Sequence, residues 1–233
     1  MLILPPAFLY FVVTERRFDM QAHPILDPSL PLPRYCEVDL SIDNQELGEA
    51  LQDATQFQEY LARIMARNGA DVLYGGYLER RRLYKDFTHF NPKGKYAREY
   101  HLGVDFWAPS GTGIYAPWAG KVSSWANRSL PGDYGPVIIL EHQRADRKLF
   151  SLYGHLSVDS LEGLYEGMPV RAGRCIARLG SVAENGGYAP HLHFQLIWDL
   201  QGYQGDYPGV CALPDLPFYG QNCPDPMDLL GYF

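Results

Sequence analysis

Residues 189–199, APHLHFQLIWD, place His191 and His193 two positions apart in an otherwise apolar run. Side chains at positions i and i+2 of a β-strand point to the same face, about 7 Å apart along the backbone. The two imidazoles therefore share one face, and Leu192 turns to the other. Histidine is costly to bury without a partner. The pair predicts a metal site, an acid–base site or two histidines that fill a core.

The segments around this stretch have the rhythm of antiparallel β-structure. From about residue 100, short apolar runs such as GKVSSWA, GPVIILEH, KLFSLYGHL and RCIARLG are separated by Gly, Pro, Asn and Asp. Such short runs bounded by turn residues are typical of strands. No long helical pattern alternates with them, so a doubly wound fold is not expected. We predict a mainly β domain over residues 100–199.

The region 20–99 is expected to be an extended arm followed by a helical segment. The arm contains the proline-rich run HPILDPSLPLPRY, and a helical pattern extends from Leu47 to Asn68, before Gly69. Two pairs could cap the start of this helix: Asp43 with Glu46, or Thr55 with Gln58. One apolar stripe should pack against the main domain. It consists of Phe57, Tyr60, Leu61, Ile64 and Met65.

Residues 1–19 are expected to be an apolar leader or a non-native start, with Met20 as the alternative initiator. The run MLILPPAFLYFVV is too short to span a bilayer. It lacks the basic region and the cleavage site of a signal peptide. A cytoplasmic location is therefore favoured, with a periplasmic or secreted one as the alternative. Residues 200–233 are rich in Pro and Gly and predict an irregular, loop-rich extension packed on the same domain.

Composition and charge exclude some classes of partner. With 46% hydrophobic and 20% charged residues, the 233-residue chain resembles ordinary globular proteins. A net charge of −7 gives no electrostatic footprint for nucleic acid, and no basic block suggests a membrane surface. The longest basic run, the three arginines at 80–82, is interpreted as a solvated face.

The four cysteines do not form a zinc-knuckle pattern, because no CxxC occurs. Cys211 and Cys223 lie in the loop-rich tail and could form a disulfide in an exported protein. The alternative is four unpaired thiols in a cytoplasmic protein.

Two further segments carry ligand-type side chains. In HLGVD, His101 and Asp105 lie four positions apart. Gly103 and the following FWAP disfavour a helix here, and an extended run also puts both side chains on one face, because four is a multiple of two. The segment SLYGHL adds His155 at the end of a predicted strand.

Histidine and carboxylate are the ligands that zinc accepts in catalytic sites. The residues alone leave two arrangements open. Three protein ligands would leave a fourth position for water, as catalysis requires. Four ligands would close the tetrahedron and make a structural site, formed by His101, Asp105, His191 and His193.

The order of these motifs resembles the M23 zinc metallopeptidases, the lysostaphin- or LytM-type endopeptidases. The resemblance covers about residues 100–197 and rests on HLGVDFWAPSGTGIYAPWAGKV, YGPVIILEH, SLYGHLS, EGMPVRAGRCIARLGS and PHLHFQL. It implies a LytM-like, antiparallel β-sheet peptidase domain with a duplicated hybrid motif. It also implies that His101, Asp105 and His193 hold Zn2+, whereas His155 and His191 form the catalytic pair. The zinc would lower the pKa of its water to about 7 and polarise the scissile carbonyl.

The function implied by this resemblance is hydrolysis of peptide bonds in peptidoglycan-type peptides, with a peptide or muropeptide as the partner. Two alternatives remain: a cytoplasmic zinc hydrolase of another small peptide or amide, and a non-catalytic LytM-type regulator. The flanking runs GGYLERRRLY, ENGGYAPHLHF, GDYPGVC and NCPDP resemble a subgroup fused to aminotransferases in bacteria. That likeness implies a functional association with aminotransferase-type enzymes.

The three remaining histidines are not expected in the catalytic set. His142 ends the VIILEH run and is interpreted as structural, and His23 and His89 lie outside the core motifs. His89 could still approach the cleft. No HExxH, GxSxG, Walker loop or GxGxxG occurs, so zincin, serine hydrolase and nucleotide-binding folds have no support.

Overall fold

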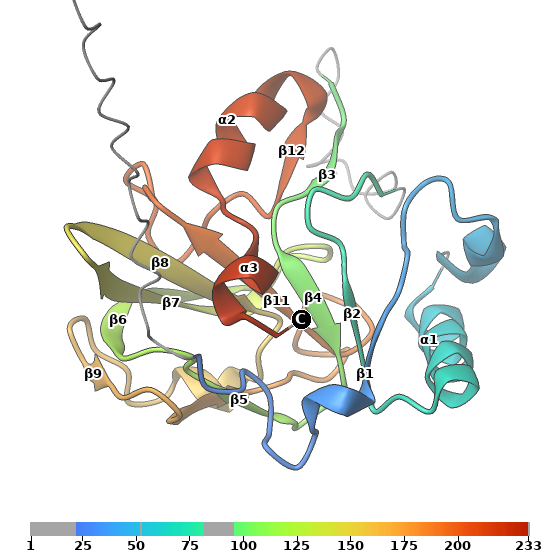
Figure 1. Cartoon of the computed structure of the whole chain (residues 1–233), viewed down its shortest axis with the longest axis horizontal. Helices are drawn as coiled ribbons and strands as arrows, with labels where there is room; N and C mark the ends of the chain where they lie inside the picture. The colour runs from blue at the N-terminus through green and yellow to red at the C-terminus, as the bar shows by residue number, and fades with distance from the viewer. Residues whose placement is uncertain (1–21, 52, 82–95, 233) are drawn as a thin grey trace, which may run out of the picture.

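The computed structural model describes residues 22–51, 53–81 and 96–232. Its centre is an eight-stranded sheet with the order β1-β2-β4-β11-β8-β7-β6-β9 (Figure 1). The strands of this sheet are β1 (Tyr35–Glu37), β2 (Val72–Gly75), β4 (Val104–Trp107), β6 (Gly120–Arg128), β7 (Gly135–Arg144), β8 (Arg147–Gly154), β9 (Pro169–Val170) and β11 (His191–Ile197). Two smaller sheets pair β10 (Cys175–Arg178) with β5 (Gly113–Tyr115), and β12 (Val210–Ala212) with β3 (Arg98–His101).

The expected mainly β, antiparallel architecture is confirmed. The strand pairs of the described residues are antiparallel, except that β1 and β2 run parallel. A parallel pair needs a crossover connection, which the helical segment between β1 and β2 provides. The region 20–99, expected as an arm and a helical segment, thus contributes two strands to the edge of the main sheet.

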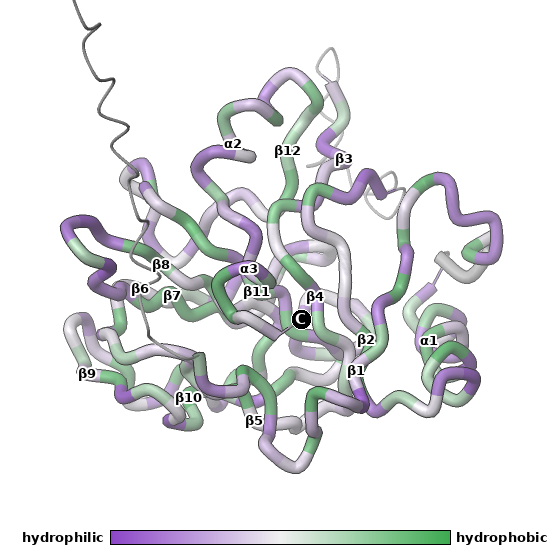
Figure 2. Tube along the Cα trace, in the orientation of Figure 1, coloured by the Kyte–Doolittle hydropathy of each residue, from purple (hydrophilic) through white to green (hydrophobic). Residues whose placement is uncertain are grey.

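The strand β11 occupies an interior position of the sheet and is buried along its whole length. Leu192, Phe194 and Leu196 enter the main hydrophobic core, so the alternation read from the sequence holds. Figure 2 shows hydrophilic segments in outer loops, such as the hairpin between β7 and β8. Because Leu192, Phe194 and Leu196 face the core, His191 and His193 lie on the opposite face of β11.

Helix α1 (Ala54–Asn68) begins later than expected. The segment before it, Gln45–Leu51, is a short 3-10 helix (η2) whose Gly48 has non-helical dihedral angles, so one continuous helix from Leu47 is wrong. The cap is Asp53, whose carboxylate accepts the Gln56 N–H at 2.8 Å, and neither expected pair supplies it.

The apolar stripe of α1 packs against the sheet, as predicted. Phe57, Tyr60 and Leu61 are buried in a cluster with Leu73 and Trp107, which lie on β2 and β4. The partly buried Ile64 and Met65 pack against the same cluster. Figure 1 shows α1 beside the β1–β2 edge of the sheet.

The C-terminal extension packs on the same domain but is more regular than expected. Besides β12 it contains η4 (Leu213–Asp215), α2 (Leu216–Asn222) and α3 (Pro226–Leu230), and Trp198 N–H donates to Asn222 O at 2.8 Å. Cys211 and Cys223 are buried and, like the other two cysteines, free, so the structure holds four thiols. Two further 3-10 turns are η1 (Leu32–Arg34) and η3 (Val158–Leu161).

No helix within the described ranges is long and apolar enough to cross a membrane. The leader predicted over residues 1–19 lies outside the described residues, as does His89.

Candidate metal centre

The register of β11 brings the predicted site residues together. His193 is paired with Asp105 on β4 at one side and with Gly154 on β8 at the other. His155 directly follows Gly154, and His191 is paired with Trp107. Because β11 lies between these two strands, three separate segments of the sequence meet around its histidine face.

His101 reaches the site by another route than the expected continuous strand. It ends β3, which pairs with β12, and the chain bends at residues 102–103 before β4 begins. A Cβ on Gly103 would lie 2.6 Å from Phe194 O and 2.9 Å from the ring of His193. Only glycine allows this close approach of backbone to ligand. His101 and Asp105 therefore share the site without sharing a strand.

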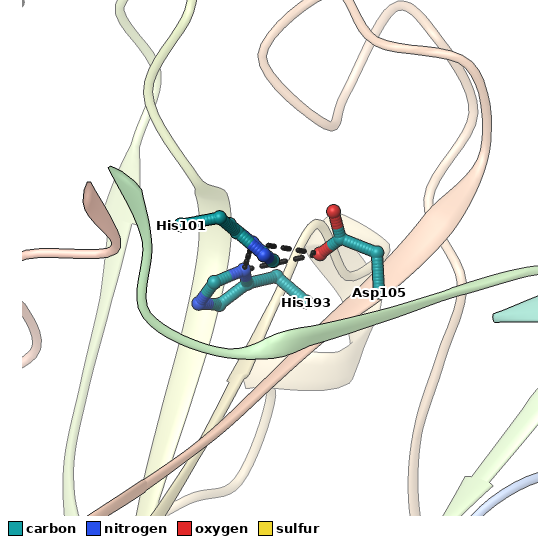
Figure 3. A group of neighbouring side chains, drawn as sticks. All are labelled: His101, Asp105 and His193. Atoms are coloured by element: carbon teal, nitrogen blue, oxygen red, sulfur yellow. Dashed lines mark hydrogen bonds and ion pairs between the residues drawn. The ribbon is translucent and has the colours of Figure 1, made fainter. Parts of the chain in front are cut away.

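Three ligand-type atoms converge at this point, as Figure 3 shows. His101 Nε2 lies 2.8 Å from His193 Nδ1 and 3.3 Å from Asp105 Oδ1. His193 Nδ1 lies 3.1 Å from the same carboxylate oxygen. All three residues are buried. The geometry thus groups the three predicted metal ligands.

Hydrogen bonds fix which ring nitrogen each ligand offers. His101 Nδ1 lies 2.9 Å from Gly76 O, and a carbonyl can only accept, so Nδ1 carries the proton. His193 Nε2 donates to Gln195 Oε1 at 3.0 Å, because the Gln195 amide nitrogen donates elsewhere, to Pro208 O. Both remaining nitrogens carry lone pairs that face one another. Outer partners of this kind orient metal-binding histidines.

The arrangement suits a zinc ion. Two facing lone pairs and a carboxylate oxygen repel one another unless a cation lies among them. Tetrahedral Zn2+ with bonds of about 2.0–2.1 Å would separate neighbouring ligand atoms by roughly 3.3 Å, close to the observed separations. Two imidazoles and one carboxylate are a known donor set for an open zinc site.

His155 and His191 form a second pair beside the ligands. Their rings lie 4.2 Å apart, and His191 Nε2 is 3.9 Å from Asp105 Oδ1. His155 Nδ1 donates to Asn185 O at 2.8 Å, and His191 Nδ1 donates to Ala189 O at 2.7 Å. Each ring therefore keeps Nε2 as its proton-accepting atom. His155 adopts a left-handed backbone with φ 63°, the kind of strain found at functional sites.

Burial keeps these histidines neutral. It lowers the pKa of His101 to about 4, with the charge of Arg81 adding to the effect, and lowers the pKa of His191. The pKa of His155 falls well below its usual value for the same reason. Burial opposes ionisation of Asp105, but the charged guanidinium of Arg81 beside it holds its pKa well below the usual range. Neutral imidazoles and an ionised carboxylate are the forms that bind metal.

Arg81 is the site residue that the sequence interpretation missed. Its side chain is 1% exposed and donates from Nη1 to Asp105 Oδ2 at 2.5 Å, so reading all of 80–82 as a solvated face is wrong. Arg80 is exposed and pairs with Glu99, as a surface residue would. Neighbouring side chains of an extended segment point to opposite faces. That alternation is the signal that could have separated the two arginines.

The centre opens on a cleft of about 360 Å³. Phe57 of α1 forms part of one wall, and Tyr203 and Tyr207 of the C-terminal extension form part of another. Arg128 also lines the cleft and pairs with Asp133 at 3.3 Å and Asp206 at 3.1 Å. Aromatic walls with a few charged groups are common in ligand-binding pockets.

The other described histidines lie apart from this centre. His142 is buried, with Nδ1 on Ala119 O at 2.9 Å and Nε2 on Ser151 Oγ at 2.7 Å, a structural role as predicted. His23 is exposed.

The fold and site together define a β-sheet domain with an open metal-ligand set beside a histidine pair. Residues 99–205 match the model of peptidase family M23.

Two curated relatives are named DD-carboxypeptidase/endopeptidase Mpg. The one from Neisseria meningitidis serogroup B is 34% identical over 96 residues, which are 41% of this chain and 19% of the relative. The one from Neisseria gonorrhoeae is 33% identical with the same coverage. The matched part is about a fifth of the length of these relatives.

Among solved structures, the catalytic domain of lysostaphin from Staphylococcus simulans is 29% identical, with a TM-score of 0.35 over 52% of this chain and 80% of that one. A zinc-containing peptidase from Vibrio cholerae is 28% identical, with a TM-score of 0.34 over 42% of this chain and 27% of that one. The narrower likeness to domains fused to aminotransferases stays a prediction.

Proposed function

We propose that the protein is a zinc-dependent metalloendopeptidase that hydrolyses peptide bonds in peptidoglycan-type peptides. The observation that carries the proposal is the convergence of three ligand atoms, with lone pairs fixed by outer hydrogen bonds, beside two neutral histidines. A structural zinc site would use a fourth protein ligand. Here His191 lies next to the three ligands but turns Nε2 toward them at the longer distance of 3.9 Å from Asp105.

His101, Asp105 and His193 would hold the ion. A bound Zn2+ supplies Lewis acidity, which polarises a carbonyl group and lowers the pKa of water at the site. The two backbone-anchored imidazoles, His155 and His191, would then handle protons. One accepts the proton of the attacking water at Nε2, and that proton then passes to the departing amine, directly or through Nε2 of the other.

The substrate class is supported by the family match and by the names of the Neisseria relatives, which describe carboxypeptidase and endopeptidase activities. The aromatic cleft suits a peptide chain. A hydrolase of another small peptide or amide would use the same residues. An experiment must therefore distinguish peptidoglycan-type peptides from other substrates. The complete set of five site residues argues against a purely non-catalytic regulator.

The test is to incubate zinc-loaded protein with a panel of muropeptides, cross-linked stem peptides, oligoglycines and peptides unrelated to peptidoglycan. Mass spectrometry should detect products that carry a new amino and a new carboxyl terminus. A chelator and His191→Ala should each abolish cleavage, whereas His23→Ala, which changes an exposed histidine, should not. Cleavage only of peptides unrelated to peptidoglycan would contradict the substrate class, and no cleavage of any peptide would contradict the peptidase proposal.

A further inference from the structure

The two carboxylate oxygens of Asp105 have different partners. Oδ1 faces the ligand nitrogens of His101 and His193 at 3.3 and 3.1 Å. Oδ2 accepts a hydrogen bond from Arg81 Nη1 at 2.5 Å. One oxygen is thus directed at the metal position, and the other is occupied by a guanidinium.

Arg81 is itself held on several sides. Its Nε donates to Glu79 Oε2 at 2.5 Å, and its guanidinium lies 5.7 Å from the centre of the Trp107 ring. Glu79 is anchored in turn, because its Oε1 accepts the Leu40 N–H at 2.8 Å. A planar guanidinium that bridges two carboxylates in this way fixes the orientation of both.

The positive charge of the Arg81 guanidinium bears on its role. A buried cation next to a metal ligand repels a divalent ion, so it weakens the electrostatic attraction for metal. A site built only for tight binding would gain by placing a neutral donor here. The guanidinium therefore does not add to the direct attraction for the ion, and its direct contact with the carboxylate is the occupation of Oδ2.

We propose that Arg81 is a positioning residue that keeps Asp105 a one-oxygen ligand of the metal. This inference rests on the proposed zinc-dependent function. If both oxygens of Asp105 bound the ion, they would fill the position that a catalytic site leaves open. By holding Oδ2, Arg81 preserves that position, and Glu79 holds Arg81 in place.

The test uses Co2+ in place of Zn2+, because the visible absorption of Co2+ weakens as its coordination number rises. We would compare the wild type, Arg81→Met and the double variant Glu79→Gln/Arg81→Met. The double variant also removes the Glu79 charge that Arg81 neutralises and keeps the test usable if the single variant does not fold. Arg80→Met is the matched control, since Arg80 forms only the exposed pair with Glu99. Elemental analysis gives the metal content of each protein.

We expect the two Arg81 variants to retain Co2+ with a several-fold weaker visible absorption. Their kcat for peptide cleavage should fall about 10- to 100-fold at a similar KM. The Arg80→Met control should match the wild type. An unchanged spectrum in the folded variants would overturn the inference, and so would loss of Co2+ from both, because Arg81 would then support metal binding itself. A wild type that takes up no Co2+ would instead contradict the proposed function.

Discussion

At the scale of single residues, His191 and His193 differ in the ring nitrogen that the protein fixes. His191 is anchored through Nδ1 to Ala189 O, and His193 through Nε2 to Gln195 Oε1. His193 therefore presents Nδ1 to His101 and Asp105, whereas His191 presents Nε2 from 3.9 Å. Two histidines that look equivalent in the sequence are prepared for different tasks.

We expect His193→Ala to lose the metal and His191→Ala to keep about one metal ion per chain. The second variant should lose turnover by about 10²- to 10⁴-fold, the usual contribution of a general acid or base. Elemental analysis and initial rates on one peptide check both expectations. Equal loss of metal from the two variants would mean that the pair is a joint ligand set.

Buried neutral histidines also predict how the stability of the metal-free protein depends on pH. Burial lowers the pKa of His142, His155 and His191 in the folded state below 6.5. Below pH 6.5 the unfolded chain therefore binds more protons than the folded one, and the free energy of unfolding falls as pH falls. Each such histidine contributes about 1.4 kcal/mol per pH unit until its folded pKa is reached. Asp105 does not contribute in this window, because its pKa lies lower.

Urea denaturation of the metal-free protein at pH 7.5 and 5.5 measures this dependence. The free energy of unfolding should be lower at pH 5.5. His142→Gln removes the buried histidine that lies outside the cleft. The free energy of unfolding of this variant should therefore fall less between the two pH values than that of the wild type. A stability that is equal or higher at pH 5.5 would show that these histidines take up protons in the folded state.

At the scale of elements, helix α1 supports the centre from outside. The ring of Phe57 makes an edge contact with Trp107 at 6.5 Å, and Trp107 stacks on His191 at 5.7 Å. The position of the helix thus bears on a catalytic candidate through two aromatic contacts.

The start of α1 can be tested through its cap. Asp53→Ala removes the acceptor for the Gln56 N–H and should lower the free energy of unfolding by about 1 kcal/mol. Thr55 lies within the first turn, and Thr55→Ala should change the free energy of unfolding by less than about 0.5 kcal/mol. Thermal or urea denaturation compares the two variants. A larger loss from Thr55→Ala would support Thr55 with Gln58, one of the two caps that the sequence left open.

The sequence predicts elements where periodicity is local and fails where a contact is distant. The two-residue period of β11 and the stripe of α1 are both found in the structure. The start of α1 is not predictable from the same pattern, because a non-helical turn at Gly48 interrupts it. The grouping of His101, Asp105 and His193 follows from the motifs, but Arg81 lies outside them and is buried against Asp105, 24 positions further along the chain. No local pattern records that partnership.

At the scale of the whole molecule, the centre is assembled from three parts of the chain. The segment that matches the family model, residues 99–205, supplies the three candidate ligands. The N-terminal part supplies their outer partners Gly76 and Arg81. The C-terminal extension holds Gln195 through Pro208 O at 3.2 Å and Cys223 Sγ at 3.3 Å. The flanking regions therefore act as the outer layer of the metal site and not as separate attachments.

This assembly predicts that metal removal weakens the whole fold. His101 belongs to the small β3–β12 sheet, whereas Asp105 and His193 belong to the main sheet, so an ion among them joins the two. Metal present at about 1,000 times its Kd would stabilise the folded chain by about 4 kcal/mol. For a chain of this length that corresponds to a rise in Tm of roughly 8–16 °C.

Differential scanning calorimetry with and without a chelator measures this shift, followed by re-addition of Zn2+ to restore it. His193→Ala is the control, because a chain that lacks a ligand should melt at the same temperature with and without Zn2+. In the metal-free chain the β3–β12 sheet is held by the bend at residues 102–103, by side-chain packing and by backbone hydrogen bonds from β3 to residues 78–81, and it is smaller than the main sheet, so it should loosen first. Protection of the β12 amides from hydrogen exchange should therefore fall more than that of β7 after chelation. Equal loss in both strands would mean that the ion stabilises the two sheets to the same extent and would contradict this expectation.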